Sequence, residues 1–183
     1  MRSLVDRSGL TFEEIYTKHS KQVYNLALHY VQNTADAEEI TQDVFVAIHR
    51  SLHKFDGRSA LSTWIYRITI NKSLDFIKTQ KRRKNFGFLS VLFYDDHHEA
   101  RHGISHADHP GIIMEQKEAV QRIFDQINRL PPNQKTALIL SKIEHKSQTE
   151  ISEIMNMSPK AVESLIQRAK TNLAKNFGPR EGK

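Results

Sequence analysis

Three histidines in the middle of the chain stand four residues apart, at His98, His102 and His106. On a helix this spacing would line one face with imidazole nitrogens, which are common zinc ligands. Gly103 and Pro110 disfavour a helix there, and no carboxylate completes a known metal-binding motif. The chain has no cysteine, which excludes thiolate ligands and disulfides. We therefore expect no metal and no other cofactor. A histidine metal sensor is the alternative.

Catalysis by this chain is not expected either. No nucleophile–base pair and no phosphate-binding loop is recognisable, so the sequence predicts no enzyme and no small-molecule substrate.

A second chemically unusual segment, residues 55–84, reads FDGRSALSTWIYRITINKSLDFIKTQKRRK. It begins with a glycine turn, contains the single tryptophan and ends in a run of positive charge. The formal net charge is +6, and residues 67–84 hold seven basic side chains against Asp75 alone. Such a cluster favours an acidic partner, such as nucleic acid, although a solvated helix face would carry the same charge. Trp64 itself is more simply explained as a core residue.

The clearest motif is SQTEISEIMNMSPKAVESLIQRAKTNL, at residues 147–173. Ser147 and Glu150 have the spacing of a capping box at the start of a short helix. Asn156 stands in the turn, where asparagine tolerates a left-handed backbone, and Ser158 with Pro159 begins a second helix. This is the spacing of a helix-turn-helix, whose second helix reads the major groove of DNA. A packed helical hairpin without a DNA role is the alternative.

The second helix of this motif has an apolar side and a polar side. Val162, Leu165, Ile166 and Ala169 are expected to face inward. Arginine can pair with phosphate or guanine, glutamine with adenine, and glutamate can accept from cytosine. The residues left pointing outward are Lys160, Glu163, Ser164, Gln167, Arg168 and Thr171.

Helical periodicity also dominates the N-terminal half. Apolar residues recur at three- and four-residue steps over 12–30, including Tyr16, and again over 37–48. Thr34 or Asp36 could cap the second of these helices. A third is expected from Ser59 or Ser62 to about residue 81. Three amphipathic helices with short connections can bury a common core.

Residues 85–113 show no sustained period and are interpreted as a linker with an apolar beginning. Helical pattern resumes at Ile112, with one apolar stripe of Val120, Ile123, Phe124 and Ile127. The fold class is therefore all-α, with two small helical domains at 10–84 and 114–177. No apolar run or signal-peptide pattern marks the chain for a membrane or for export, so a cytoplasmic location is expected.

Taken in order, these segments resemble the extracytoplasmic-function (ECF) group of bacterial sigma factors. DAEEITQDVFVAIHR resembles the region-two helix that docks on RNA polymerase. FDGRSALSTWIYRITINKSLDFIK resembles the segment that recognises and melts the −10 element. LPPNQKTALIL and the helix-turn-helix resemble region four, which binds the −35 element. The spacer resembles the short linker that replaces region three in this group.

The resemblance implies a transcription initiation factor whose partners are core RNA polymerase, promoter DNA and an anti-sigma factor, often membrane-anchored in this family. The acidic face that it assigns to polymerase docking comprises Glu38, Glu39, Gln42 and Asp43. The residues that it assigns to the −10 element are Phe55, Asp56, Gly57, Arg58, Ser59, Arg67, Asn71, Asp75, Lys78, Arg82 and Arg83, in which the loop Phe55–Leu61 corresponds to a pocket for a flipped base. The −35 element is assigned to the six outward residues of the last helix.

Three residues depart from the family pattern. Asp75 stands where an uncharged amide is expected, and Glu163 and Leu165 stand where basic residues are common. The resemblance therefore predicts an unusual promoter preference. Two alternatives stay open from the residues alone: an ordinary helix-turn-helix regulator with an effector-sensing domain at 10–84, and a membrane-surface role for the basic helix.

Overall fold

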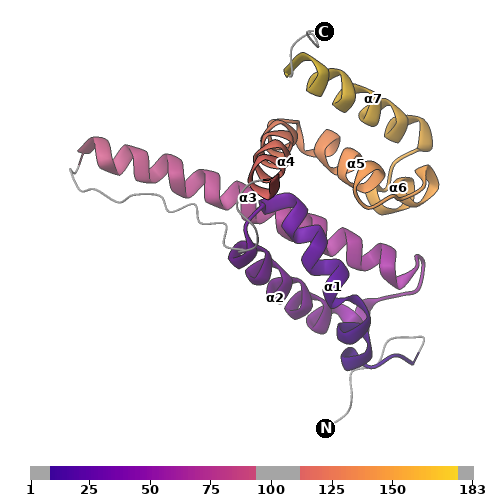
Figure 1. The fold of residues 1–183 in the computed structure, drawn as a ribbon. Helices are drawn as coiled ribbons and strands as arrows, with labels where there is room; N and C mark the ends of the chain where they lie inside the picture. The colour runs from indigo at the N-terminus through magenta and orange to yellow at the C-terminus, as the bar shows by residue number, and fades with distance from the viewer. Residues whose placement is uncertain (1–8, 94–111, 177–183) are drawn as a thin grey trace. The chain divides into compact units, whose positions relative to one another are not determined.

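The computed structural model describes residues 9–93 and 112–176. Within these residues the chain forms seven α-helices and one short 3-10 helix, and no β-sheet, as predicted (Figure 1). The backbone divides into two compact units. One comprises Met1–Arg58 with Ile68–Ser105, and the other comprises Ser59–Arg67 with His106–Lys183. The domain boundaries predicted from the sequence, 10–84 and 114–177, stay predictions.

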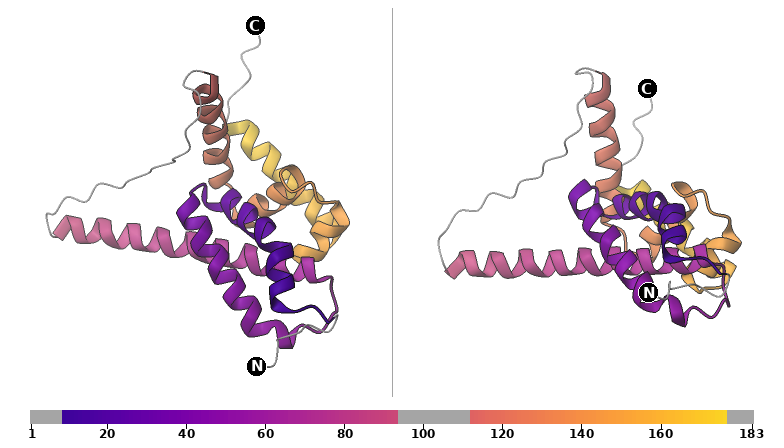
Figure 2. Two further views of the ribbon diagram at one scale, coloured as in Figure 1. Left: turned by 60° about the horizontal axis from the view of Figure 1, so that its bottom comes forward. Right: turned by 90° about the horizontal axis from the view of Figure 1, so that it is seen from below.

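The first unit is built from α1 (Phe12–Val31), α2 (Thr34–Ser51), the 3-10 helix η1 (Leu52–Lys54) and most of α3 (Leu61–Phe93). Helices α1 and α2 pack side by side along their lengths (Figure 2). Their shared core includes Ile15, Leu26 and Tyr30 of α1 and Ile40 and Ile48 of α2, all at most 1% exposed. Burying an aliphatic side chain of this size contributes roughly 1.5–3 kcal/mol.

Local signals fix the ends of α1 and α2. Thr11 and Glu14 form a capping box at the start of α1. The cap of α2 is Asn33, whose side-chain oxygen accepts from the backbone N–H of Asp36 at 3.0 Å. The predicted caps, Thr34 and Asp36, are therefore wrong. Asn33 takes the cap because its backbone is extended, whereas Thr34 is already the first helical residue.

Two large apolar residues of these helices lie partly in solvent, and the first of them belongs to a predicted stripe. Tyr16 of α1 is 49% exposed, with its ring 4.6 Å from that of Phe45. Val46 of α2 is similarly exposed. A helix stripe is broader than the surface that one neighbouring helix covers, so residues at its edge remain accessible.

Helix α3 is longer than predicted. It continues to Phe93 rather than ending near residue 81 (Figure 1). The predicted linker, 85–113, therefore contains helical residues at both of its ends, because α4 begins at Ile112. The segment after Lys84 contains no proline before Pro110, and a single glycine such as Gly87 costs only about 1 kcal/mol in a helix.

The second unit contains α4 (Ile112–Asn128), α5 (Pro132–Lys142), α6 (Gln148–Met155) and α7 (Pro159–Asn176). Helix α5 packs against both α6 and α7, and α4 also contacts α7. The most buried residues of the core are Ala137, Ile139, Leu140, Ile151, Val162 and Ala169. Of the stripe predicted on α4, Ile127 is buried, whereas Val120 and Ile123 are 51% and 46% exposed.

Candidate nucleic-acid interface

Helix α7 presents one polar face. Val162 and Ala169 are fully buried against the other helices. Lys160, Glu163, Gln167, Arg168 and Thr171 are exposed, and Ser164 is half-buried. All six predicted residues therefore lie on the accessible side of α7. The Thr171 hydroxyl donates to the carbonyl of Gln167 at 3.1 Å, so its proton is already used within the helix.

The turn before α7 has the predicted geometry. Ser147 accepts from the backbone N–H of Glu150, whose carboxylate accepts from the N–H of Ser147, and this confirms the capping box. Asn156 ends α6 with φ 51° and ψ 51°, in the left-handed region. The hydroxyl of Ser158 accepts from the N–H of Ala161, and α7 begins at Pro159. Sequence and structure thus agree on a helix-turn-helix.

Two side-chain contacts of α7 were missed by the sequence reasoning. Gln148 donates from Nε2 to the carbonyl oxygen of Pro159 at 2.8 Å. Asn172 donates from Nδ2 to Oε1 of Gln134 on α5, also at 2.8 Å. These residues are separated by 11 and 38 positions, so no helical period predicts either contact. The one available signal was the amide side chain at each position.

The loop after η1 is shaped by Asp56. One carboxylate oxygen accepts from the backbone N–H of Arg58 at 3.1 Å, and the other lies 2.9 Å from Nε of the same residue. Gly57, between these two residues, has φ +74°, a backbone conformation that residues with a side chain rarely adopt. Phe55 is 9% exposed, while Asp56 and Arg58 lie in solvent. The loop therefore exposes Arg58 beside Asp56, while the neighbouring Phe55 is buried in the protein.

The predicted DNA face of α3 separates into two environments. Asn71, Asp75 and Lys78 are exposed, as are Arg82 and Arg83 farther along the helix. Arg67 is half-buried, and its guanidinium donates to the carbonyl oxygens of Ile154 and Glu153. Carbonyls in the last turn of a helix lack intrahelical donors, and a cation there is favoured by the helix dipole. In this structure Arg67 thus caps the end of α6.

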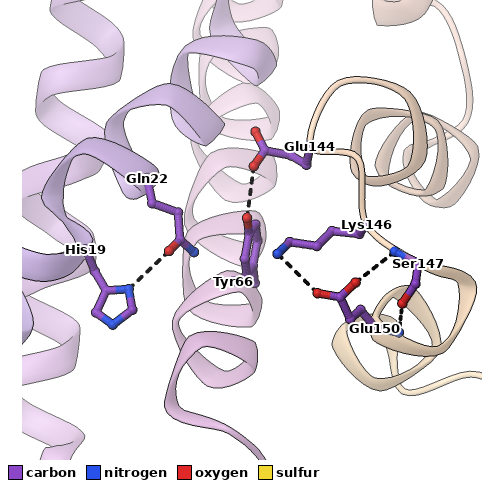
Figure 3. Close-up of polar contacts among 7 residues, drawn as sticks. All are labelled: His19, Gln22, Tyr66, Glu144, Lys146, Ser147 and Glu150. Atoms are coloured by element: carbon purple, nitrogen blue, oxygen red, sulfur yellow. Dashed lines mark hydrogen bonds and ion pairs between the residues drawn. The ribbon is translucent and has the colours of Figure 1, made fainter.

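Tyr66, next to Arg67 within the same unit, also makes polar contacts with other side chains (Figure 3). Its hydroxyl donates to the Glu144 carboxylate at 2.9 Å, and Nζ of Lys146 lies 5.0 Å from the ring centroid. Burial, followed by the negative charge of Glu144, raises the pKa of Tyr66 well above its ordinary value. The phenol is therefore held neutral as a hydrogen-bond donor.

The pKa of Glu150 is shifted in the opposite direction, below its ordinary value. The backbone N–H of Ser147, then its hydroxyl and the ammonium of Lys146, lower the pKa of this carboxyl. Lys146 lies 3.2 Å from the carboxylate (Figure 3). The start of α6 is thus held by a carboxylate that stays ionised at neutral pH.

The predicted docking face lies along α2. Glu38, Glu39, Gln42 and Asp43 are all exposed, opposite the buried Ile40 and Val44. Asp43 also lies 3.8 Å from Lys72 of α3, within the first unit. An exposed pair at this distance contributes little to stability, and it leaves the acidic character of the face largely intact.

Neither a metal cluster nor a membrane-spanning helix occurs in the described part of the chain. His98, His102 and His106 lie outside the described residues, so their predicted lack of a metal stays a prediction.

Comparison with known proteins identifies two family regions. Residues 15–83 match sigma-70 region 2, and residues 121–173 match sigma-70 region 4. The chain belongs to the ECF group of the sigma-70 family. Together, the two matched segments contain all the predicted site residues. The first includes the acidic face of α2, and the second includes the polar face of α7. The paired regions also decide against an ordinary helix-turn-helix regulator.

Relatives of this sigma factor span nearly its whole length. The ECF RNA polymerase sigma-E factor of Haemophilus influenzae is 29% identical over 168 residues, covering 92% of this chain and 88% of the relative. The RNA polymerase sigma-H factor of Pseudomonas aeruginosa is 28% identical, covering 92% and 86%. These comparisons confirm the prediction of a factor that directs RNA polymerase to promoters.

Solved structures confirm the fold. CnrH, solved in complex with the cytosolic domain of CnrY, aligns with a TM-score of 0.61 at 21% identity, covering 91% of this chain and 86% of that chain. The sigma factor RpoE of Bartonella quintana, solved with the anti-sigma factor NepR, aligns with a TM-score of 0.60 at 17% identity, covering 93% and 98%.

Proposed function

We propose that this ECF sigma factor divides promoter recognition between two surfaces. The polar face of α7 reads the −35 element, and the loop with the exposed face of α3 recognises and opens the −10 element. The observation that carries the proposal is the face of α7, where Glu163, Gln167 and Arg168 are exposed opposite the fully buried Val162 and Ala169. A helix presented in this way can place side chains against base edges in the major groove.

In the −10 surface, Arg58 lies exposed in the short loop between η1 and α3 and can hydrogen-bond an unstacked base. Unstacking costs a few kcal/mol, which binding contacts can supply without a chemical energy source. Asn71 and Asp75 lie on the accessible face of α3, while Lys78, Arg82 and Arg83 contact phosphates. Arg67 joins this surface only when its guanidinium exchanges the carbonyls of Ile154 and Glu153 for DNA.

Asp75 gives the −10 surface a specific preference. A carboxylate repels phosphate but accepts a hydrogen bond from the amino group of cytosine. We therefore assign Asp75 to a cytosine contact at the upstream edge of the element.

The acidic face of α2 docks on core RNA polymerase. Glu38, Glu39, Gln42 and Asp43 are exposed together along one side of the helix. Such a face complements a basic partner surface and accelerates association. An anti-sigma factor that covers these faces would keep the protein inactive. Support comes from CnrH and RpoE of Bartonella quintana, which were both solved in complexes, the latter with an anti-sigma factor.

The proposal is tested by transcription in vitro with core RNA polymerase of the same organism. Templates are promoters mapped from transcripts that rise on overexpression, each with its −35 or its −10 bases replaced in a second version. Arg168→Ala should reduce initiation on the intact promoter and make little difference where the −35 bases are already replaced. Asn71→Ala should show the same pattern for the −10 bases.

Lys175→Ala is the charge-matched control for Arg168→Ala, because it removes one exposed positive charge two turns farther along α7. It should weaken initiation on the intact and the −35-replaced templates by the same factor. If Arg168→Ala behaves like this control, α7 does not read the −35 bases.

A further inference from the structure

Helix α7 is joined to the rest of its unit by side-chain amides near both of its ends. Near the start, Gln148 donates to the carbonyl oxygen of Pro159 at 2.8 Å. Near the end, Asn172 donates to Gln134 at 2.8 Å. The two attachment points are 13 residues apart on the helix, which corresponds to about 20 Å.

Each attachment leads to a part of the fold that is itself fixed. Gln148 is the first residue of α6, where the Ser147–Glu150 capping box holds the backbone. Its carbonyl oxygen also accepts from the hydroxyl of Ser152 at 2.7 Å. Gln134 belongs to α5, whose following residues, 135–140, are all buried. The amides therefore connect α7 to backbone that cannot easily move.

The apolar contacts of α7 do not fix its orientation as closely. Dispersion and hydrophobic contacts are non-directional, and the buried residues Val162 and Ala169 are small. A hydrogen bond, by contrast, weakens steeply outside a donor–acceptor distance of about 2.7–3.2 Å. A displacement of about 1 Å at one end tilts a helix of this length by about 3°, and base contacts along it have the same narrow tolerance.

We propose that Gln148 and the Gln134–Asn172 pair are positioning residues for −35 recognition, which fix the tilt and rotation of α7 against the DNA. The proposal rests on the role assigned to the polar face of α7 above. A positioning residue has a distinctive signature, because its loss displaces every base-contacting side chain at once. Removing a single contact such as Arg168 affects the base that it touches.

The experiment uses the full chain with core RNA polymerase and a pool of duplex promoter fragments whose −35 bases are randomised. Bound fragments are sequenced, and the base preference at each position is compared between variants. Gln148→Met keeps the side-chain length and removes the donor. Gln134→Leu removes the acceptor for Asn172, whereas Gln134→Glu keeps an acceptor and should restore the preference.

Two further variants calibrate the readout. Arg168→Ala is the reference for loss of a direct contact. Thr149→Ala changes an exposed neighbour of Gln148 and should leave the preferences unchanged. Thermal unfolding of every variant reports the folded fraction, because a loss of stability alone lowers binding to all fragments by one factor and leaves the preferences as they were.

We expect Gln148→Met and Gln134→Leu to reduce discrimination about threefold to tenfold at several adjoining −35 positions, the effect of one lost neutral hydrogen bond. Unchanged preferences in both variants would overturn the proposal. So would a loss at one position in Gln148→Met, because this would make Gln148 a direct contact. If Arg168→Ala leaves every position unchanged, the assignment of α7 itself fails, which is a separate result.

Discussion

The hydroxyl of Tyr66 donates a hydrogen bond to the carboxylate of Glu144 at 2.9 Å, across 78 positions of sequence. Tyr66 is 5% exposed, and Lys146 lies against its ring. The residue beside it, Arg67, donates to the last carbonyls of α6. The first turns of α3 are therefore held by directional polar contacts as well as by burial.

Tyr66→Phe should remove a phenol whose ionisation is shifted to higher pH. Its folded-state pKa is raised, so ionised Tyr66 is disfavoured in the folded protein. The stabilisation by the neutral phenol is fully present below the unfolded pKa of about 10 and is lost as pH rises above it. Absorbance of tyrosinate during an alkaline titration measures this. Tyr16→Phe, at a half-exposed position, is the control for the loss of one phenol.

Glu150→Gln should make the stability of the second unit less sensitive to acid. The folded-state pKa of this carboxyl is lowered, so its contribution is present above the unfolded value of about 4.5 and disappears as pH falls. Hydrogen exchange of the slowest amides in α5 and α7 reports the unfolding free energy of this unit. A wild-type unit that shows the same acid sensitivity as Glu150→Gln would contradict the role of the cap.

Asn156→Ala should lower the unfolding free energy of the second unit by about 1–2 kcal/mol, because alanine is strained in the left-handed region. Asn156→Gly should remain within about 0.5 kcal/mol of the wild type, since glycine adopts this conformation freely. The same exchange measurement compares the two. Equal stability of the alanine and glycine variants would show that the turn can change its conformation at no cost.

Replacing Arg82 and Arg83 together by glutamine should weaken promoter binding for all sequences. Each phosphate contact contributes about 0.9 to the slope of log affinity against log salt for duplex DNA, so the slope should fall by about 1–2. Filter binding of the holoenzyme to promoter and to random DNA over a salt series measures this. A loss confined to the promoter sequence would instead assign these arginines to base reading.

The amino-acid sequence was sufficient to predict the family, the all-helical fold and the local structure of the helix-turn-helix. The capping box at Ser147, the left-handed Asn156 and the start of α7 at Pro159 were all predicted correctly. These features could be predicted because each depends on the types of residues within three or four positions. The backbone geometry of a helix end is similar from one protein to the next. The exposed faces of α2 and α7 followed from helical periodicity for the same reason.

The ends of the helices and the edges of the apolar stripes were predicted less accurately. Asn33 replaced the predicted caps of α2, α3 ran on to Phe93, and Tyr16, Val120 and Ile123 proved partly exposed. Periodicity indicates which side of a helix is apolar, but how much of that side is covered depends on the neighbouring helices.

The polar contacts between residues far apart in the sequence could not be predicted and became apparent only in the folded structure. Four hydrogen bonds show this. Gln148 donates to Pro159, and Asn172 donates to Gln134. Tyr66 donates to Glu144, and Arg67 donates to the end of α6. A hydrogen bond requires its donor and acceptor within about 3 Å, and for residues far apart in sequence that distance is set by the packing of whole helices. The sequence therefore predicts which residues contact a promoter, whereas the hydrogen bonds between packed helices are the basis for proposing which residues position them.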